Sequence, residues 1–367
     1  MVSQSSMKVE VPGKLMVAGE FAVLEPNQHL IVMAVDRYVY ATINHSKKNY
    51  LHLLDFQLET TWEYKDNRIV VASDDSRTKF VEEAMTVAVN YLRERGYTVT
   101  PFQLSIKSEL DDESGVKYGL GSSAAVVTSV ITAILNKFLS FTPSPKLIYQ
   151  LASISHVLTQ GNGSGADVAA SSYGGFLNYS SFQADWLQAA YQESRSLTEL
   201  LECDWTYASL EPVTLPNSIY LCIGWTGKPA STKKLVDELM QLKTKNPDSF
   251  LTFLLQSEQA VNKVLQGMKE NKTEILLEGI KENRQALASV GRHANVDIET
   301  SLLTKLCDLA ETFGGAGKPS GAGGGDCGIA FMPSKEAADK LITAWKDVGI
   351  KPLSLKPYPY GAKVIKA

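Results

Sequence analysis

Residues 117–125, which read KYGLGSSAA, constrain this chain more than any other segment. Glycines and serines stand directly before an apolar run there, so the pattern predicts a loop that leads into the first turn of a helix. Such a loop binds phosphate, because the first N–H groups of a helix have no internal partner and the helix dipole is positive at that end. Gly119 and Gly121 allow the backbone to approach an anion closely. The alternative is a Gly-Ser turn that only caps a core helix.

Composition narrows the classes of partner. The chain has 367 residues, which favours two domains, and its apolar and charged fractions of 44% and 21% are ordinary for a globular enzyme. The net charge of −4 gives no indication of a nucleic-acid or membrane partner. Local hydrogen-bond donors must therefore hold any anionic substrate. Nothing in the composition fixes an oligomeric state.

Cysteine usage and apolar runs predict a cytoplasmic protein. The first ten residues are polar, so we expect no secretion signal, and the apolar run 124–139 is too short to cross a bilayer. The four cysteines include no CxxC pair, which fits a reducing compartment and gives no sign of a metal site. They are Cys203, Cys222, Cys307 and Cys327.

The hydrophobic periodicity mixes strands with helices along the whole chain. In the first half it predicts strands at 8–11, 14–19, 30–43, 51–58, 68–72 and 102–107, and helices at 78–95, 123–139 and 145–158. In the second half it predicts strands at 219–225, 327–332 and 351–355, and helices at 231–242, 247–268, 273–290, 302–313 and 335–348. The polar segment 180–204 between the halves is the predicted place of a domain boundary.

Three further segments are rich in glycine or end in a charged residue. Residues 12–24 place Lys14 between a Pro-Gly turn and an apolar strand, although a plain surface lysine is the alternative. Residues 161–167 read GNGSGAD and end in Asp167, which alternatively caps a helix. Residues 314–328 carry a run of glycines that leads into a strand. Glycine is costly in entropy, so this run predicts close approach of the backbone to a ligand.

Taken in order, these motifs resemble those of the GHMP kinase superfamily, which phosphorylates small molecules. The carrying segments are PGKLMVAGE at 12–20, GLGSSAA at 119–125 and SGAGGGDCG at 320–328. The resemblance implies an α+β fold with two domains. Residues 1–190 are expected to form an N-terminal ATP-binding domain like domain 2 of ribosomal protein S5. Residues 191–367 are expected to form a ferredoxin-like C-terminal domain, with the active site in the cleft between the two.

Within the superfamily, the chain resembles the bacterial phosphomevalonate kinases. The resemblance rests on residues 117–123, 161–167 and 225–232. It implies transfer of the γ-phosphate of ATP to (R)-5-phosphomevalonate, a step of isoprenoid biosynthesis. Mevalonate kinase or another kinase of the superfamily is the alternative, and a non-catalytic metabolite sensor is an alternative of another class.

The resemblance also implies roles for individual residues. Asp167 is expected to orient or deprotonate the acceptor, and Lys14 to neutralise charge on the transferred group. The ATP-binding candidates are Lys117, Gly119, Leu120, Gly121, Ser122, Ser123 and Ala124. The substrate-binding candidates are Lys117, Ser164, Ser231, Thr232, Ser320 and Gly321.

Magnesium is the implied cofactor, and Ser123 is its expected protein ligand, together with phosphate oxygens and water, with Asp167 as a further candidate. Mevalonate kinases carry an acidic ligand about three helical turns before the aspartate. In this chain that position falls near His156, which is a departure from the pattern. The second protein ligand of Mg²⁺ therefore stays open.

Overall fold

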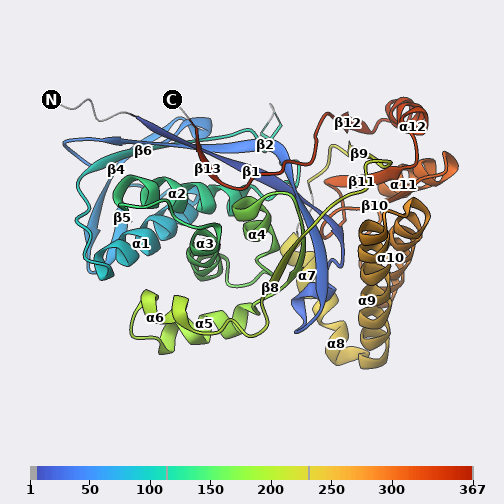
Figure 1. Ribbon diagram of the computed structural model, residues 1–367, viewed down its shortest axis with the longest axis horizontal. Coiled ribbons are helices and arrows are strands. Elements are labelled where there is room, and N and C mark those ends of the chain that lie inside the picture. The colour runs from blue at the N-terminus through green and yellow to red at the C-terminus, as the bar shows by residue number, and fades with distance from the viewer. Residues whose placement is uncertain (1–5, 113–114, 230–231, 366–367) are drawn as a thin grey trace.

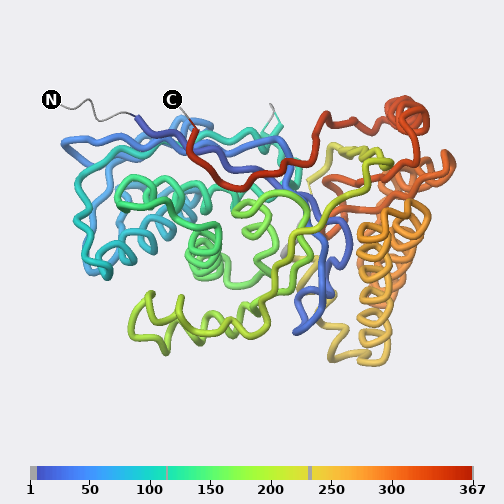
Figure 2. Tube along the Cα trace, in the orientation of Figure 1, coloured from blue at the N-terminus to red at the C-terminus, as the bar shows by residue number. Residues whose placement is uncertain are grey.

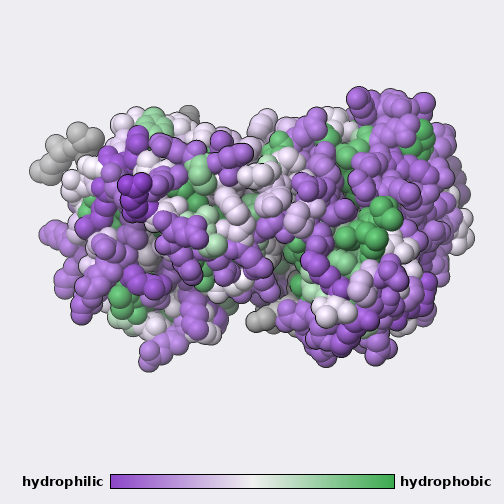
Figure 3. Space-filling model, turned by 90° about the horizontal axis from the view of Figure 1, so that it is seen from below, coloured by the Kyte–Doolittle hydropathy of each residue, from purple (hydrophilic) through white to green (hydrophobic). Residues whose placement is uncertain are grey.

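The computed structural model describes residues 6–112, 115–229 and 232–365. These residues form two lobes that lie side by side, as Figure 1 shows. Seen from below, the surface is mostly hydrophilic, an indentation separates the lobes, and an apolar patch lies on the lobe at the right of Figure 3. Among the helices of these three stretches, none combines the length and apolar character needed to cross a membrane.

The first lobe is a large sheet with helices beneath it in Figure 1. Its strands run in the order β13-β1-β2-β6-β3-β4-β5, and β7 pairs with β2 and β8. The strands are β1 (Met7–Ala18), β2 (His29–His45), β3 (Tyr50–Leu53), β4 (Leu58–Lys65), β5 (Arg68–Val71), β6 (Phe102–Ser108), β7 (Phe176–Ser180), β8 (Ser209–Val213) and β13 (Lys363–Ile365). The helices are α1 (Lys79–Glu94), α2 (Ser122–Phe138), α3 (Pro145–Gln160), α4 (Ala166–Tyr173), α5 (Ala184–Glu193) and α6 (Leu197–Glu202).

The second lobe joins a small sheet to a group of helices. The strand order is β10-β11-β9-β12, with every neighbouring pair antiparallel. The strands are β9 (Tyr220–Trp225), β10 (Ala316–Pro319), β11 (Cys327–Met332) and β12 (Lys351–Leu353). The helices are α7 (Thr232–Met240), α8 (Leu242–Lys245), α9 (Pro247–Glu270), α10 (Thr273–Ala294), α11 (Ser301–Thr312) and α12 (Lys335–Asp347). Mixed helices and sheets in two lobes confirm the predicted α+β class.

Two predicted strand boundaries are wrong. The predicted strands 8–11 and 14–19 are one strand, β1 (Met7–Ala18), because a register shift between Pro12 and Gly13 absorbs the expected turn without breaking the pairing with β2. The expected strand 51–58 is divided: β3 ends at Leu53, and a 3₁₀ turn over Leu54–Phe56 precedes β4. Gln57 adopts a left-handed conformation there, which breaks the extended run.

The segment 180–204 holds two helices that the periodicity did not predict. Helices α5 and α6 form because Leu187, Leu197 and Leu200 are buried in the core of the first lobe. The chain then returns to the large sheet, where β8 pairs with β7, before β9 enters the small sheet. At its end the chain comes back, and β13 pairs with β1. The red end of the tube beside the blue strand in Figure 2 shows this return. A division into domains at residue 190 stays a prediction.

Candidate active site

The predicted phosphate-binding loop (residues 117–121, the phosphate loop) leads directly into α2. The N-cap is Gly121, with φ 77° and ψ 41°, and no side chain caps the helix. Helix α2 begins at Ser122, so the predicted start at Ser123 is late by one residue, and the serines lie in the first turn instead of capping it. Ser122 and Ser123 are partly exposed, whereas Leu120 and Ala124 are buried and anchor the loop to the core. This geometry leaves the N–H groups of the first turn available to an anion.

Lys14 lies under this loop and is only 9% exposed, so the surface-lysine alternative is wrong. Its backbone N–H donates to the carbonyl of Leu120 at 2.9 Å, and its Nζ donates to the carbonyl of Gly119 at 3.1 Å. The bulge at Gly13 permits this approach, because a Cβ there would lie 2.9 Å from the Leu120 oxygen. Strand β1 thus delivers one ammonium group to the phosphate loop.

Asp167, in the first turn of α4, also lies beside the phosphate loop. A Cβ built on Gly121 would lie 3.0 Å from Cγ of Lys14 and 3.5 Å from Cβ of Asp167. The two predicted catalytic side chains therefore both pack against the space beside Gly121 of the loop. Asp167 is partly exposed, and its Oδ1 accepts the N–H of Val168 at 3.0 Å, within its own helix.

A buried tyrosine fixes the turn before α4. The hydroxyl of Tyr179 donates to the carbonyl of Ser164 at 2.6 Å, and the Ser164 hydroxyl accepts the N–H of Ala166 at 3.3 Å. Burial raises the pKa of Tyr179, and the nearby charge of Asp167 raises that pKa further. The phenol therefore stays protonated and keeps donating to the turn. Gly165 is required there, because a Cβ would lie 2.3 Å from the Phe182 ring.

The third glycine segment folds from the second lobe onto the phosphate loop. A Cβ on Gly119 would lie 2.8 Å from the carboxylate of Asp326. The thiol of Cys327 donates to the carbonyl of Tyr118 at 3.1 Å, and the Tyr118 ring packs edge-on to Trp225 at 4.9 Å. The structure therefore brings segments of both lobes together around residues 118–121.

Two charged residues of this cluster, Asp326 and Arg37, are not among the predicted site residues. Asp326 stands alone among glycines, which was a usable signal. Arg37 lies on β2 with its guanidinium 4.7 Å from the centre of the Tyr118 ring, and no local pattern distinguishes it from other strand residues. Both sit close enough to Cys327 to influence the pKa of its thiol.

The other candidates have different surroundings. Lys117 is exposed and forms an isolated β-bridge with Asp111. Burial raises the pKa of the Asp111 carboxyl, and the charge of Lys117 opposes that rise. The Ser320 hydroxyl is engaged twice with Met16, donating to its carbonyl at 2.9 Å and accepting its N–H at 3.0 Å. Thr232 begins α7, and Ser231 lies outside the described residues.

His156 lies beneath the loop, at the position where the resemblance placed an acid. Its Nε2 is 3.3 Å from Oγ of Ser123, and its ring lies 5.4 Å from that of Phe80. Within the described residues, no three His, Cys, Asp or Glu side chains are grouped so as to hold a metal ion.

We expect one of the four cysteines to react with a disulfide reagent in the folded protein. Cys203 is exposed, whereas Cys222, Cys307 and Cys327 are buried. Burial raises the pKa of all three, that of Cys222 to about 12, so the reactive thiolate is scarce near neutral pH. Thiol titration before and after adding denaturant measures this. Fast reaction of Cys327 would contradict the close packing of the third glycine segment.

Known proteins share this architecture. Residues 80–175 match the N-terminal domain of GHMP kinases, and residues 265–351 match the GHMP kinase C-terminal model. The chain is 34% identical over 370 residues to a phosphomevalonate kinase of Streptomyces sp. (strain CL190), covering 96% of this chain and 98% of that protein. This chain therefore belongs to the GHMP kinases.

Two solved structures refine the comparison. The Lin0012 protein of Listeria innocua superposes with a TM-score of 0.93 and 38% identity, covering 99% of this chain and 100% of that one. The phosphomevalonate kinase of Streptococcus pneumoniae, solved in complex with phosphomevalonate and AMPPNP, gives a TM-score of 0.83 and 28% identity. That alignment covers 96% of this chain and 99% of the pneumococcal one.

Proposed function

We propose that this protein transfers the γ-phosphoryl group of ATP to (R)-5-phosphomevalonate, giving 5-diphosphomevalonate and ADP in the mevalonate pathway of the cytoplasm. The proposal depends above all on the packing of Lys14 and Asp167 beside Gly121, at a helix start that no side chain caps. The similarity to a pneumococcal kinase that binds phosphomevalonate and AMPPNP supports the choice of substrates.

The residues can perform this transfer mainly by position and charge. The N–H groups of residues 119–124 hold the phosphates of ATP, and Lys14 neutralises charge on the transferred group. The Lys14 ammonium has three N–H donors. One donates to the carbonyl of Gly119, so two remain for phosphate oxygens. Asp167 orients the acceptor. A phosphate acceptor needs little help from a base, because its second pKa is near 6.

Magnesium fits these residues as a nucleotide-bound ion. Mg²⁺ commonly binds through one or two protein ligands together with substrate phosphates and water. The Ser123 hydroxyl and the Asp167 carboxylate would hold it from the starts of two helices, which agrees with the lack of a three-residue cluster among the described residues. When bound, the ion supplies positive charge to the phosphates.

Lys117, Ser164, Ser231, Thr232, Ser320 and Gly321 are the proposed acceptor contacts. Because the Ser320 hydroxyl is already engaged with Met16, Ser320 contributes through its position in the loop more than through its side chain. A coupled assay of ADP release tests the proposal with mevalonate, phosphomevalonate, homoserine and galactose. Turnover with phosphomevalonate is expected. Turnover with mevalonate alone would instead make the protein a mevalonate kinase, and ATP binding without turnover would make it a sensor.

Replacing Lys117 with Ala should raise the KM for phosphomevalonate about tenfold or more while changing the KM for ATP little, since a charge-assisted hydrogen bond contributes roughly 1.5–3 kcal/mol. The physical reason is that Lys117 is exposed beside the loop, where its ammonium can reach the acceptor phosphate. Initial rates at varied concentrations of each substrate measure both constants. Lys146→Ala, at an exposed lysine at the start of α3, is the control. A rise in the KM for ATP alone would place Lys117 on the nucleotide instead.

A further inference from the structure

Glu20 and Lys318 form an ion pair that is completely enclosed between the lobes. The Lys318 side chain is 0% exposed and that of Glu20 is 3% exposed. Glu20 follows β1 in the first lobe, and Lys318 lies on β10 in the second. The Lys318 ammonium donates to Oε1 of Glu20 and also to the carbonyl of Pro319 at 2.6 Å. The pair joins two glycine-rich segments that are 298 residues apart in sequence.

A buried ion pair of this kind adds little to the free energy of folding. Removing two charges from water costs about as much as their attraction returns, and apolar replacement of a buried pair is often neutral or stabilising. Oε2 of Glu20 makes no hydrogen bond to any described residue, which adds to the cost. We therefore look for a role of the pair other than stabilising the fold.

What the pair holds is the start of the loop 320–326. Oε1 of Glu20 also accepts the N–H of Gly321 at 3.3 Å, and Ser320 is fastened to Met16 beside it. On the other side, the N–H of Gly324 donates to the carbonyl of Ile298 at 2.8 Å. The loop ends at Asp326, whose carboxylate lies against Gly119 of the phosphate loop.

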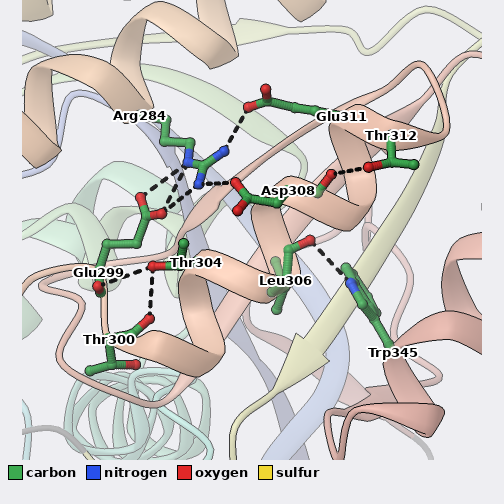
Figure 4. A network of polar contacts seen from close by, with 9 residues as sticks. All are labelled: Arg284, Glu299, Thr300, Thr304, Leu306, Asp308, Glu311, Thr312 and Trp345. Atoms are coloured by element: carbon green, nitrogen blue, oxygen red, sulfur yellow. Dashed lines mark hydrogen bonds and ion pairs between the residues drawn. The ribbon is translucent and has the colours of Figure 1, made fainter.

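The segment around Ile298, which accepts this hydrogen bond, is held in place by ion pairs. The next residue, Glu299, accepts from Arg284 at 2.6 Å, and the same guanidinium contacts Asp308 at 2.6 Å and Glu311 at 2.7 Å. Figure 4 shows this network joining α10, the segment before α11 and α11 itself. The Glu20–Lys318 pair thus connects the loop 320–326 to the first lobe. The Arg284–Glu299 pair fixes the segment around Ile298 within the second lobe.

We propose that Glu20 and Lys318 are a positioning pair, which sets the loop 320–326 against the phosphate loop so that Gly119 and Lys14 are in place for phosphoryl transfer. The inference rests on the proposed function for its kinetic consequence only. Neither residue is assigned a contact with substrate. The pair acts through the N–H of Gly321 and through the path of the loop to Asp326.

The test is a double variant, Glu20→Met with Lys318→Met, which removes both charges together and leaves no unpaired ion. We expect a melting temperature equal to or above that of the wild type. We expect kcat/KM for ATP to fall about ten- to a hundredfold, as for other small misplacements of positioning groups. The amides of residues 320–326 should exchange hydrogen faster. Glu20→Gln with Lys318→Met restores an acceptor for Gly321 and should recover part of the loss.

The matched control is another ion pair between the lobes. Glu25 and Lys243 are 2.8 Å apart, and replacing both with Met should leave kcat/KM and loop exchange unchanged. If the Glu20/Lys318 variant is folded and keeps wild-type kcat/KM and exchange, the positioning role is wrong. If the wild type does not turn over phosphomevalonate, the proposed function fails instead. Hydrogen exchange and ADP affinity by calorimetry then still decide the role of the pair.

Discussion

An Asp167→Asn variant folds normally and loses at least about a hundredfold in kcat, the scale on which a positioned acid–base group contributes. Asp167 is packed at the phosphate loop beside Gly121, with its turn fixed by Tyr179 and Ser164. Asparagine keeps the shape of the side chain but loses the negative charge that orients the acceptor and helps to hold Mg²⁺. Rates at saturating ATP and phosphomevalonate measure the loss, and circular dichroism confirms the fold.

Asp185→Asn is the control for this prediction. Asp185 lies in the first turn of α5, as Asp167 lies in the first turn of α4, but it is exposed and belongs to no predicted site. Loss of its charge removes the same helix-dipole contribution, so kcat should stay within about twofold of the wild type. Near wild-type kcat in the Asp167 variant would remove that residue from the mechanism.

A Gly121→Val variant should lose measurable ATP binding while most of the fold persists. Gly121 has φ +77°, which a β-branched residue resists, and the new Cβ would lie 3.0 Å from Cγ of Lys14. The added methyl groups would also cover the N–H groups that we assign to phosphate. Isothermal titration calorimetry with ATP and MgCl₂ measures the affinity.

Gly96→Val separates backbone strain from loss of the site. Gly96 has φ +79°, close to that of Gly121, but nothing lies within 4 Å of a Cβ built there. We expect this control to lose stability and to keep the nucleotide affinity of the wild type. Unchanged affinity in a folded Gly121 variant would mean that the loop is structural only.

The local parts of the site were predictable from sequence, because each depends on neighbouring residues. The glycines and serines of 119–123 predict a helix start, and the periodicity of 145–158 predicts α3. The structure confirms the latter, since the Ser144 hydroxyl accepts the N–H of Leu147 at 3.2 Å. The functional roles of the individual site residues stay predictions until the variants are measured.

Contacts between distant segments could not be predicted in the same way. The burial of Lys14 depends on the carbonyls of Gly119 and Leu120, which lie more than a hundred residues further along the chain. The Glu20–Lys318 pair and the packing of Asp326 on Gly119 depend on how the lobes meet. Helices α5 and α6 were missed because both are short and their apolar residues are buried only by packing on α1 and α3.

The identity of the product decides whether this protein phosphorylates (R)-5-phosphomevalonate. Phosphorus NMR of a reaction containing the enzyme, ATP, MgCl₂ and (R)-5-phosphomevalonate distinguishes a new diphosphate from the starting monophosphate. We predict that the monophosphate signal is replaced by two coupled diphosphate signals, with one ADP formed for each diphosphomevalonate. An unchanged monophosphate signal with active, nucleotide-bound enzyme would contradict it, as would phosphorylation of mevalonate but not of phosphomevalonate.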